Sequence, residues 1–405
     1  MTKVALLHYS APPVIGGVES VLGHHARLMA NAGHQVQIVA GRGEQTDPRI
    51  PFIHLPMADS RHPEVLAVKA ELDLGRVPAK FTELVESLTA DLSETLDDID
   101  LLIAHNVCSL NKNLALTAAV HNLVDLDQLH VILWHHDLAW TTPRYRAELH
   151  DGYPWDLLRQ AWVGVRQVTI SEMRRRELAE LFQINPAEIT VVPNGVDISK
   201  FHKLEKQTRE YVNQLGLLHA SPLLLLPVRI TPRKNIELAL RVCASLRQHF
   251  PDTKLVVTGP LGPHNPANVK YFERLVALRK ELGLENVVCF LAELSVEYIP
   301  DEMISDFYHL VDALFLPSQE EGFGIPILEA GLAGLPIFCS DIPPLRSLGG
   351  PYATYFSPDT DPVELANMMA KSLFSDPVFQ LRTLMRSRYT WEHIYAQNIA
   401  PLLVE

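Results

Sequence analysis

Short apolar runs alternate with longer stretches of helical length along the whole chain. Continuous apolar runs are typical of strands that are buried on both faces of a parallel sheet. Strands that alternate with helices in this way build doubly wound sheets, so the pattern predicts an α/β protein. The expected strands cover residues 4–7, 35–40, 101–104, 131–134, 168–171, 189–192, 223–228, 254–259, 287–290, 312–316 and 335–339.

The length and the repeated architecture predict two domains. A chain of 405 residues with 47% hydrophobic residues can bury two ordinary cores. The turn sequence PNGVD at 193–197 separates the last expected strand of the first half from a polar connection. We therefore predict an N-terminal domain over 1–197 and a C-terminal domain over 198–388.

A glycine-containing turn joins an expected strand to an apolar helical segment in the second half. Gly322 and Gly324 permit a sharp turn and let a ligand approach the backbone closely. The helix that begins near Ile325 presents N–H groups and a positive dipole end, which suit a phosphate. Glu321 and Glu329 accept hydrogen bonds only, which suits the hydroxyl groups of a sugar. The alternative interpretation is an ordinary helix start whose dipole both carboxylates favour.

Two other strand ends carry residues suited to a diphosphate. Arg229 and Lys234, five residues apart, follow an expected strand, and a guanidinium fork and an ammonium can converge on one diphosphate. Gly16 and Gly17 lie between the first expected strand and a helical stretch, a geometry that lets a phosphate approach. A plain tight turn is the alternative for the two glycines.

Two adjacent histidines end an expected strand of the first half. In a doubly wound sheet, ligands bind beyond the carboxyl ends of the strands, so His135 or His136 is placed where a site residue would lie. The alternative is a histidine at a strand end that bonds to a backbone carbonyl.

Charge and composition narrow the partners. Lys and Arg number 35 against 48 Asp and Glu, and the net charge of −13 argues against nucleic acid as a partner. The apolar runs are too short for a signal peptide or a membrane span, and the four cysteines are far apart. We expect buried thiols and a cytoplasmic protein, with peripheral membrane contact left open.

Two carboxylate runs, at 97–100 and 125–127, are similar to a metal-binding Asp-x-Asp motif. Both lie in loop or strand-entry positions away from the other candidate residues. We interpret them as solvated surface and predict no catalytic metal.

These segments together resemble the large family of retaining, nucleotide-sugar-dependent glycosyltransferases with the GT-B fold (family 4-like, group 1). The stretches that carry the resemblance are the glycine pair at 16–17, PNGVD at 193–197, Arg229 with Lys234, and EGFGIPILE at 321–329. The resemblance implies two Rossmann-like domains that face a central cleft. It also implies a last helix, at about 389–405, that crosses back to the first domain.

The resemblance implies a role for each matching residue. Arg229 and Lys234 would hold the donor diphosphate, Glu321 the hydroxyls of the donor sugar, and Glu329 the ribose, while His136 would orient the sugar. The implied catalytic residues are His136, Arg229, Lys234 and Glu321. The implied donor-binding residues are Gly16, Gly17, Arg229, Lys234, Leu294, Glu321, Gly322, Phe323, Gly324, Ile325, Leu328 and Glu329.

The expected activity is therefore retaining, metal-independent transfer of a hexosyl group. The donor would be a UDP- or GDP-linked sugar, with no further cofactor, and the acceptor a hydroxyl of a sugar, a glycerate-like small molecule or a lipid-linked glycan. Two alternatives stay open: a GT-B sugar phosphorylase or nucleotide-sugar epimerase, and a non-catalytic nucleotide-sugar binding protein. The sugar, the nucleotide and the oligomeric state are not specified by these motifs.

Overall fold

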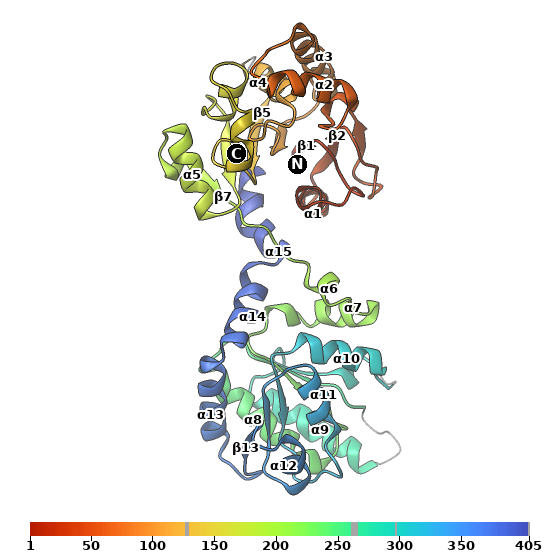
Figure 1. Ribbon diagram of the computed structural model, residues 1–405. Helices are drawn as coiled ribbons and strands as arrows, with labels where there is room; N and C mark the ends of the chain where they lie inside the picture. Colours follow the sequence, from red (N-terminus) through yellow and green to blue (C-terminus); the bar gives the residue numbers. More distant parts are fainter. Residues whose placement is uncertain (126–128, 261–265, 296–297, 404–405) are drawn as a thin grey trace. The chain divides into compact units, whose positions relative to one another are not determined.

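The computed structural model describes residues 1–125, 129–260, 266–295 and 298–403. The chain forms two compact units (Figure 1). Unit 1 consists of Met1–Gly195 together with Trp391–Glu405, and unit 2 of Val196–Thr390.

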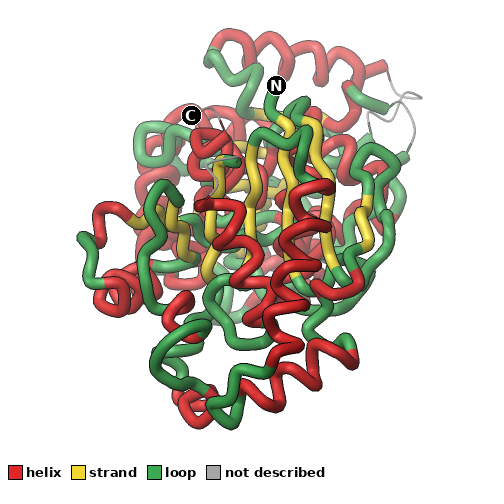
Figure 2. Tube along the Cα trace, turned by 90° about the horizontal axis from the view of Figure 1, so that it is seen from above, coloured by secondary structure: helices red, strands yellow, loops and turns green. Residues whose placement is uncertain are grey.

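The sheet of unit 1 has seven parallel strands in the order β3-β2-β1-β4-β5-β6-β7. Figure 2 shows strands lying side by side with helices packed around them. The strands are β1 (Lys3–His8), β2 (Gln35–Ala40), β3 (Phe52–His54), β4 (Leu101–His105), β5 (His130–His135), β6 (Arg166–Thr169) and β7 (Ile189–Val191). The α-helices among them are α1 (Gly17–Asn31), α2 (Pro63–Leu72), α3 (Ala79–Thr95), α4 (Leu114–Asp125) and α5 (Glu172–Phe182).

Both faces of this sheet are covered, because successive side chains of a strand point to opposite faces. Val4 and Leu6 of β1 belong to the core that α1 completes. Ala5 and Leu7 belong to a second core on the other face, together with residues of α2, α3 and α4. Burial on both faces explains why the strands are continuous apolar runs rather than alternating ones.

The sheet of unit 2 has six parallel strands in the order β10-β9-β8-β11-β12-β13. The strands are β8 (Leu223–Leu226), β9 (Lys254–Val257), β10 (Val288–Phe290), β11 (Ala313–Leu316), β12 (Ile337–Ser340) and β13 (Thr354–Phe356). The α-helices are α6 (Ile198–Phe201), α7 (Lys206–Gln214), α8 (Ile236–Leu246), α9 (Pro266–Glu281), α10 (Asp301–Leu310), α11 (Ile325–Leu332), α12 (Pro343–Gly349), α13 (Pro362–Ser375) and α14 (Pro377–Arg388).

In each sheet the strand order reverses beside the first strand, between β1 and β4 in unit 1 and between β8 and β11 in unit 2. Ligands of doubly wound folds bind beyond the carboxyl ends of the strands at this switch point. The α/β class and the two Rossmann-like parallel sheets predicted from the apolar runs are therefore confirmed.

The last segment of the chain belongs to unit 1. It begins with α15 (Trp391–Ile394) and continues through two short helical segments, Tyr395–Ile399 and Ala400–Leu403. Ile394, Ile399 and Leu402 lie in the core that β1 and α1 share. The hydroxyl of Thr2 donates to the carbonyl of Leu403 at 3.1 Å, so the first and last described parts of the chain lie side by side.

Within the described ranges, none of the helices combines the length and the apolar character that a membrane crossing requires. The four cysteines, Cys108, Cys243, Cys289 and Cys339, are all buried and unbridged.

Candidate functional site

The turn between β11 and α11 depends on one glycine. Gly324 has a φ of +105°, a left-handed conformation that favours glycine, and a Cβ there would lie 2.7 Å from Cδ2 of Leu345. Gly322 is unlike it, because a Cβ at this position would meet nothing within 4 Å. Gly324 is also the N-cap of α11, and no described side chain caps the helix. Pro326 has no N–H and the N–H of Ile327 donates to the carbonyl of Gly324 at 2.9 Å, so among the first three helix positions the N–H of Ile325 is the one available to an anion.

Lys234 and Glu321 form a buried ion pair beside this turn. Nζ of Lys234 lies 2.5 Å from Oε1 of Glu321, and the two side chains are 9% and 8% exposed. The hydroxyl of Ser318, itself fully buried, donates to the same oxygen at 2.7 Å. Oε2 of Glu321 receives no hydrogen bond from the described residues. One oxygen of this carboxylate is thus held by the protein, and the other is left to a ligand.

Backbone contacts join the loop after β8 to the loop after β11. Gln319 donates its N–H to the carbonyl of Arg233 at 2.9 Å, and the guanidinium of Arg233 donates to the carbonyl of Glu320 at 3.4 Å. Asn235, with a φ of +51°, ends the 3₁₀ turn that carries Lys234 and begins α8. These contacts place the Lys234–Glu321 pair at the switch point of the sheet.

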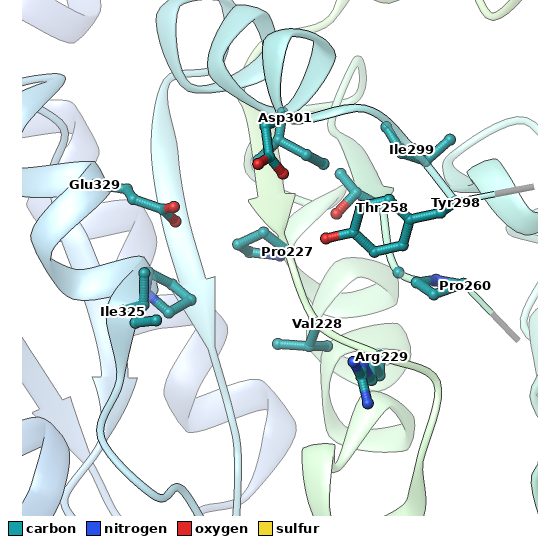
Figure 3. Close-up of a pocket in the computed structure, with 13 residues that line it drawn as sticks. Pro227, Val228, Arg229, Thr258, Pro260, Tyr298, Ile299, Asp301, Ile325 and Glu329 are labelled. Atoms are coloured by element: carbon teal, nitrogen blue, oxygen red, sulfur yellow. The ribbon is translucent and has the colours of Figure 1, made fainter. Parts of the chain in front are cut away.

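A cavity of about 290 Å³ opens at the same edge of the sheet. Arg229, which is exposed, lies beyond the end of β8, and Glu329 reaches the cavity from α11. Figure 3 shows the carboxylates of Glu329 and Asp301 pointing into the cavity, with Tyr298 on a third side. The cavity therefore combines a cation at one end with hydrogen-bond acceptors and an aromatic ring toward the other.

Glu329 has a partner on the neighbouring helix. The hydroxyl of Tyr308, on α10, donates to Oε2 of Glu329 at 2.6 Å. Burial and the adjacent carboxylate raise the pKa of Tyr308 well above its ordinary value, so the hydroxyl keeps its proton and remains a donor. Oε1 of Glu329 receives no hydrogen bond from the described part of the chain.

The glycine loop of unit 1 lies at the start of α1. Gly16 is the N-cap and Gly17 the first residue of the helix. A Cβ at Gly16 would lie 2.0 Å from Oε2 of Glu19, whereas one at Gly17 would meet nothing within 4 Å. The hydroxyl of Ser10 donates to Oε1 of Glu19 at 2.7 Å, so this carboxylate is folded back onto the loop. A Cβ at position 16 would therefore only require the flexible end of the Glu19 side chain to move.

Histidines gather at the carboxyl ends of β1, β4 and β5. Nδ1 of His8 lies 2.7 Å from the carbonyl of His105, and Nδ1 of His105 lies 3.2 Å from Nε2 of His136. Burial lowers the pKa of His136 to about 3, with further lowering from the charges of His8 and His135. The ring of His25 packs 5.3 Å from that of His105, and burial lowers its pKa to about 3 as well. The cluster is therefore neutral at pH 7.

His135 faces a different neighbour. Its Nε2 lies 2.7 Å from Oε1 of Gln167 on β6, and its side chain is 1% exposed. The backbone N–H of His136 donates to Oδ1 of Asn106 at 2.7 Å. The two adjacent histidines thus differ, since His135 is bonded to the next strand and His136 lies in the histidine cluster.

Sequence models of known protein families match both units. The sequence model of "Glycosyltransferase Family 4" matches residues 15–200, and that of "Glycosyl transferases group 1" matches residues 207–387. The chain belongs to the group 1 glycosyltransferases.

Curated relatives of this glycosyltransferase carry related names. The MMP α-(1→4)-mannosyltransferase of Mycolicibacterium hassiacum is 26% identical over 98% of this chain and 97% of its own length. The mannosylglucosylglycerate synthase of Thermotoga maritima is 26% identical over 84% of this chain and 83% of its own. The D-inositol 3-phosphate glycosyltransferase of Nocardia farcinica is 28% identical, but over only 44% of this chain and 38% of its own.

The structure of this group 1 glycosyltransferase gathers some of the predicted site residues and separates others. Arg229, Ile325 and Glu329 line the cavity, and Lys234 contacts Glu321 beside it. Leu294 lies outside the cavity lining and packs, half-buried, against the core of unit 2.

Four predicted residues, one of them the buried Gly324, lie around the turn without lining the cavity. Phe323 is 56% exposed and Leu328 44% exposed, and Gly322 is exposed as well. The predicted roles of all the site residues, those of His136, Gly16 and Gly17 included, stay predictions.

Asp301 and Tyr298, which line the cavity, were not predicted from the sequence, and neither were Ser318 and Tyr308. Ser318 lies three residues before Glu321 in the same loop, so its proximity could have been inferred. Tyr308 lies on a different helix from Glu329, and nothing in the sequence between them indicates a contact.

Both carboxylate runs belong to unit 1. Asp98 forms an ion pair with Lys3, and Asp100 accepts a hydrogen bond from the backbone of Lys3 at 2.8 Å. Asp125 lies 3.2 Å from Nδ1 of His121, and Asp127 is outside the described residues. Among the residues that the structure describes, no three His, Cys, Asp or Glu side chains are grouped so that they could hold a metal ion.

Proposed function

We propose that this group 1 glycosyltransferase transfers a hexosyl group from a nucleoside diphosphate sugar to a hydroxyl acceptor, with retention and without a catalytic metal. The observation that supports this most is the set of charged side chains at one edge of the sheet of unit 2. There Arg229 and Glu329 line one cavity, and the Lys234–Glu321 pair lies on the adjoining loops. The donor would place its nucleoside in the cavity and its diphosphate toward Arg229 and the start of α11.

The charges at this edge suit the departure of a diphosphate. As the glycosidic bond breaks, negative charge develops on the leaving phosphate oxygens, and preorganised donors that meet this charge lower the barrier most. Arg229 offers a planar fork of donors. The ammonium of Lys234 has three donors and its partner Glu321 takes one, so the others remain for the diphosphate. Oε2 of Glu321 is left to accept a hydroxyl of the donor sugar.

The names of the relatives narrow the substrates to test first. They mention mannosyl transfer, a mannosylglucosylglycerate product and an inositol phosphate. We therefore favour a mannosyl group from a GDP- or UDP-linked donor, and a sugar or a small glycerate-like molecule as the acceptor. A lipid-linked glycan is the further acceptor class to include.

The test combines binding and transfer. A thermal-shift panel of UDP-, GDP- and ADP-linked sugars should give a rise in melting temperature with one nucleotide class. The donor so identified is then assayed with the three acceptor classes, and the anomeric configuration of the product is read by NMR.

Each alternative has its own signature. Release of a sugar phosphate points to a phosphorylase and an isomerised donor to an epimerase. Binding with no turnover on any acceptor points to a binding protein. An unchanged melting temperature with every nucleotide sugar would contradict the proposal.

A further inference from the structure

Glu329 stands between two cavities of unit 2. One is the 290 Å³ cavity that Arg229 lines, and the other, of about 450 Å³, lies between α10 and α11. Glu329 lines both, whereas Tyr308 lines only the second. Tyr308 therefore approaches the Glu329 carboxylate from the side away from Arg229.

The hydrogen bond between these two residues fixes one carboxylate oxygen. Tyr308 is 4% exposed and donates to Oε2 of Glu329 at 2.6 Å. Since Oε1 has no hydrogen-bond donor among the described residues, it is the oxygen left for a ligand. Figure 3 shows the carboxylate of Glu329 directed into the cavity that Arg229 lines.

Glu329 is half-buried, and a glutamate side chain that is not held in place loses conformational entropy when a ligand orders it, which weakens the binding. A buried tyrosine that hydrogen-bonds one carboxylate oxygen orders the glutamate before the ligand arrives, so that less side-chain entropy is lost on binding. The ribose of a nucleotide offers two neighbouring hydroxyl donors, the kind of group that a carboxylate oxygen accepts.

We propose that Tyr308 is a positioning residue for ribose recognition: its hydroxyl holds Oε2 of Glu329 so that Oε1 meets the 2′- and 3′-hydroxyls of the donor nucleotide. This inference rests on the proposed function, because it requires a nucleotide in the cavity. Tyr308 itself does not touch the nucleotide. It acts through the orientation of Glu329.

The experiment measures how much the ribose hydroxyls contribute to binding. UDP, GDP and ADP are titrated calorimetrically into the full-length protein, and the tightest binder is compared with its 2′,3′-dideoxy form. In the wild type the dideoxy form should bind more weakly. In Tyr308→Phe the complete nucleotide should bind about three- to tenfold more weakly, while the affinity of the dideoxy form stays unchanged.

Two further variants complete the design. In Glu329→Gln the difference in affinity between the complete and the dideoxy nucleotide should be smaller still than in Tyr308→Phe, because this substitution alters the group that accepts the hydrogen bonds of the ribose hydroxyls. Thr208→Val is the matched control, since Thr208 is also buried and its hydroxyl also donates to a carboxylate on α10, that of Asp306, and neither residue lines either cavity. It should leave both affinities unchanged, and melting temperatures confirm that each variant is folded.

The outcomes separate the two proposals. If Tyr308→Phe weakens the complete and the dideoxy nucleotide equally, or changes neither affinity, the positioning role is wrong while nucleotide binding stands. If the wild-type protein binds none of UDP, GDP and ADP, the proposed function fails, and this inference fails with it.

Discussion

Lys234 donates to Oε1 of Glu321, and Ser318 donates to the same oxygen. The pair is more than 90% buried on both sides, so each member has a structural as well as a chemical role. Removing one member of a buried ion pair is strongly destabilising, because the remaining charge stays buried without its counter-ion.

Arg229 and Lys234 should therefore differ when each is replaced by alanine. Lys234→Ala should lower the free energy of unfolding by about 3 kcal/mol, because it leaves the Glu321 carboxylate buried with only Ser318 as a partner. Arg229→Ala should change stability by less than about 0.5 kcal/mol, since Arg229 is exposed. Both should cost about 2–4 kcal/mol of transition-state stabilisation. Urea unfolding beside a transfer assay checks this, and equal stabilities of the two variants would contradict it.

Substitutions of the two carboxylates, Glu321 and Glu329, should affect different measured quantities. Glu321→Gln should lower turnover more than nucleotide affinity, because Oε2 of Glu321 is placed to accept from the donor sugar. Glu329→Gln should weaken binding of the donor and of the free nucleoside diphosphate together, since both carry the ribose. Nucleotide affinity from calorimetry and turnover should be measured on the same preparations of each variant. Small, equal effects of the two substitutions would mean that both residues only stabilise the helix start.

Gly324→Ala and Gly322→Ala form a matched pair. Alanine at position 324 requires a left-handed conformation and contacts Leu345, so unfolding should become easier by about 1–3 kcal/mol. Alanine at position 322 meets nothing within 4 Å and should be close to neutral. Thermal or urea unfolding measures both. A neutral Gly324→Ala would show that the turn adopts another backbone conformation.

The buried histidines should make unit 1 less stable in acid. Burial, with smaller contributions from the charges of His136 and His24, lowers the folded-state pKa of His25 from 6.5 to about 3. Because the unfolded chain binds the proton first, the stability that the neutral form contributes is present above pH 6.5 and is lost as the pH falls toward 3. The free energy of unfolding should therefore decrease as the pH is lowered from 8 to 5.

His25→Phe tests which group is responsible. Both ring nitrogens of His25 lack hydrogen-bond partners among the described residues, so a phenyl ring replaces the imidazole without removing a bond. The variant should show a shallower dependence of stability on pH, by at most about 1.4 kcal/mol per pH unit. An unchanged slope would assign the acid sensitivity to other groups.

Activity should survive an excess of EDTA, because Arg229, Lys234 and the N–H of Ile325 at the start of α11 can meet the charge of the leaving diphosphate. Turnover before and after chelation measures this. A strict need for Mn²⁺ or Mg²⁺ that is restored by adding the ion back would overturn the metal-independent mechanism.

The sequence predicted the sheets well where strands are buried on both faces, because such strands are continuous apolar runs. The strand ends were less well predicted: β1, β4 and β5 are longer than expected, whereas several strands of unit 2 are shorter. The strand expected over 223–228 stops at Leu226, since the N–H of Val228 turns back to the carbonyl of Leu226 at 3.0 Å. The prediction missed β3 (Phe52–His54) and β13 (Thr354–Phe356), which are not fully buried and so are not continuous apolar runs.

For the candidate site, the sequence indicated which loops carry charged residues but not how those residues pair. Arg229 and Lys234 were expected to act alike, yet only Lys234 lies against Glu321, 87 residues further along the chain. His8 and His105 are 97 residues apart and meet only because β1 and β4 are neighbours in the sheet. Contacts of this kind depend on strand order and rotamer, which a single sequence does not encode locally.

The return of the last segment to unit 1 affects how the protein is made. Ile394, Ile399 and Leu402 fill part of the core between β1 and α1, although about half of the chain separates them from the rest of that core. On the ribosome, residues 1–195 emerge first but stay without these side chains until residues 394–402 have been translated. The nascent first unit therefore holds an open apolar surface while the second unit is synthesised and folds. A stop codon after Thr390 would leave that surface uncovered permanently, so loss of the last fifteen residues should be seen as aggregation of the whole protein.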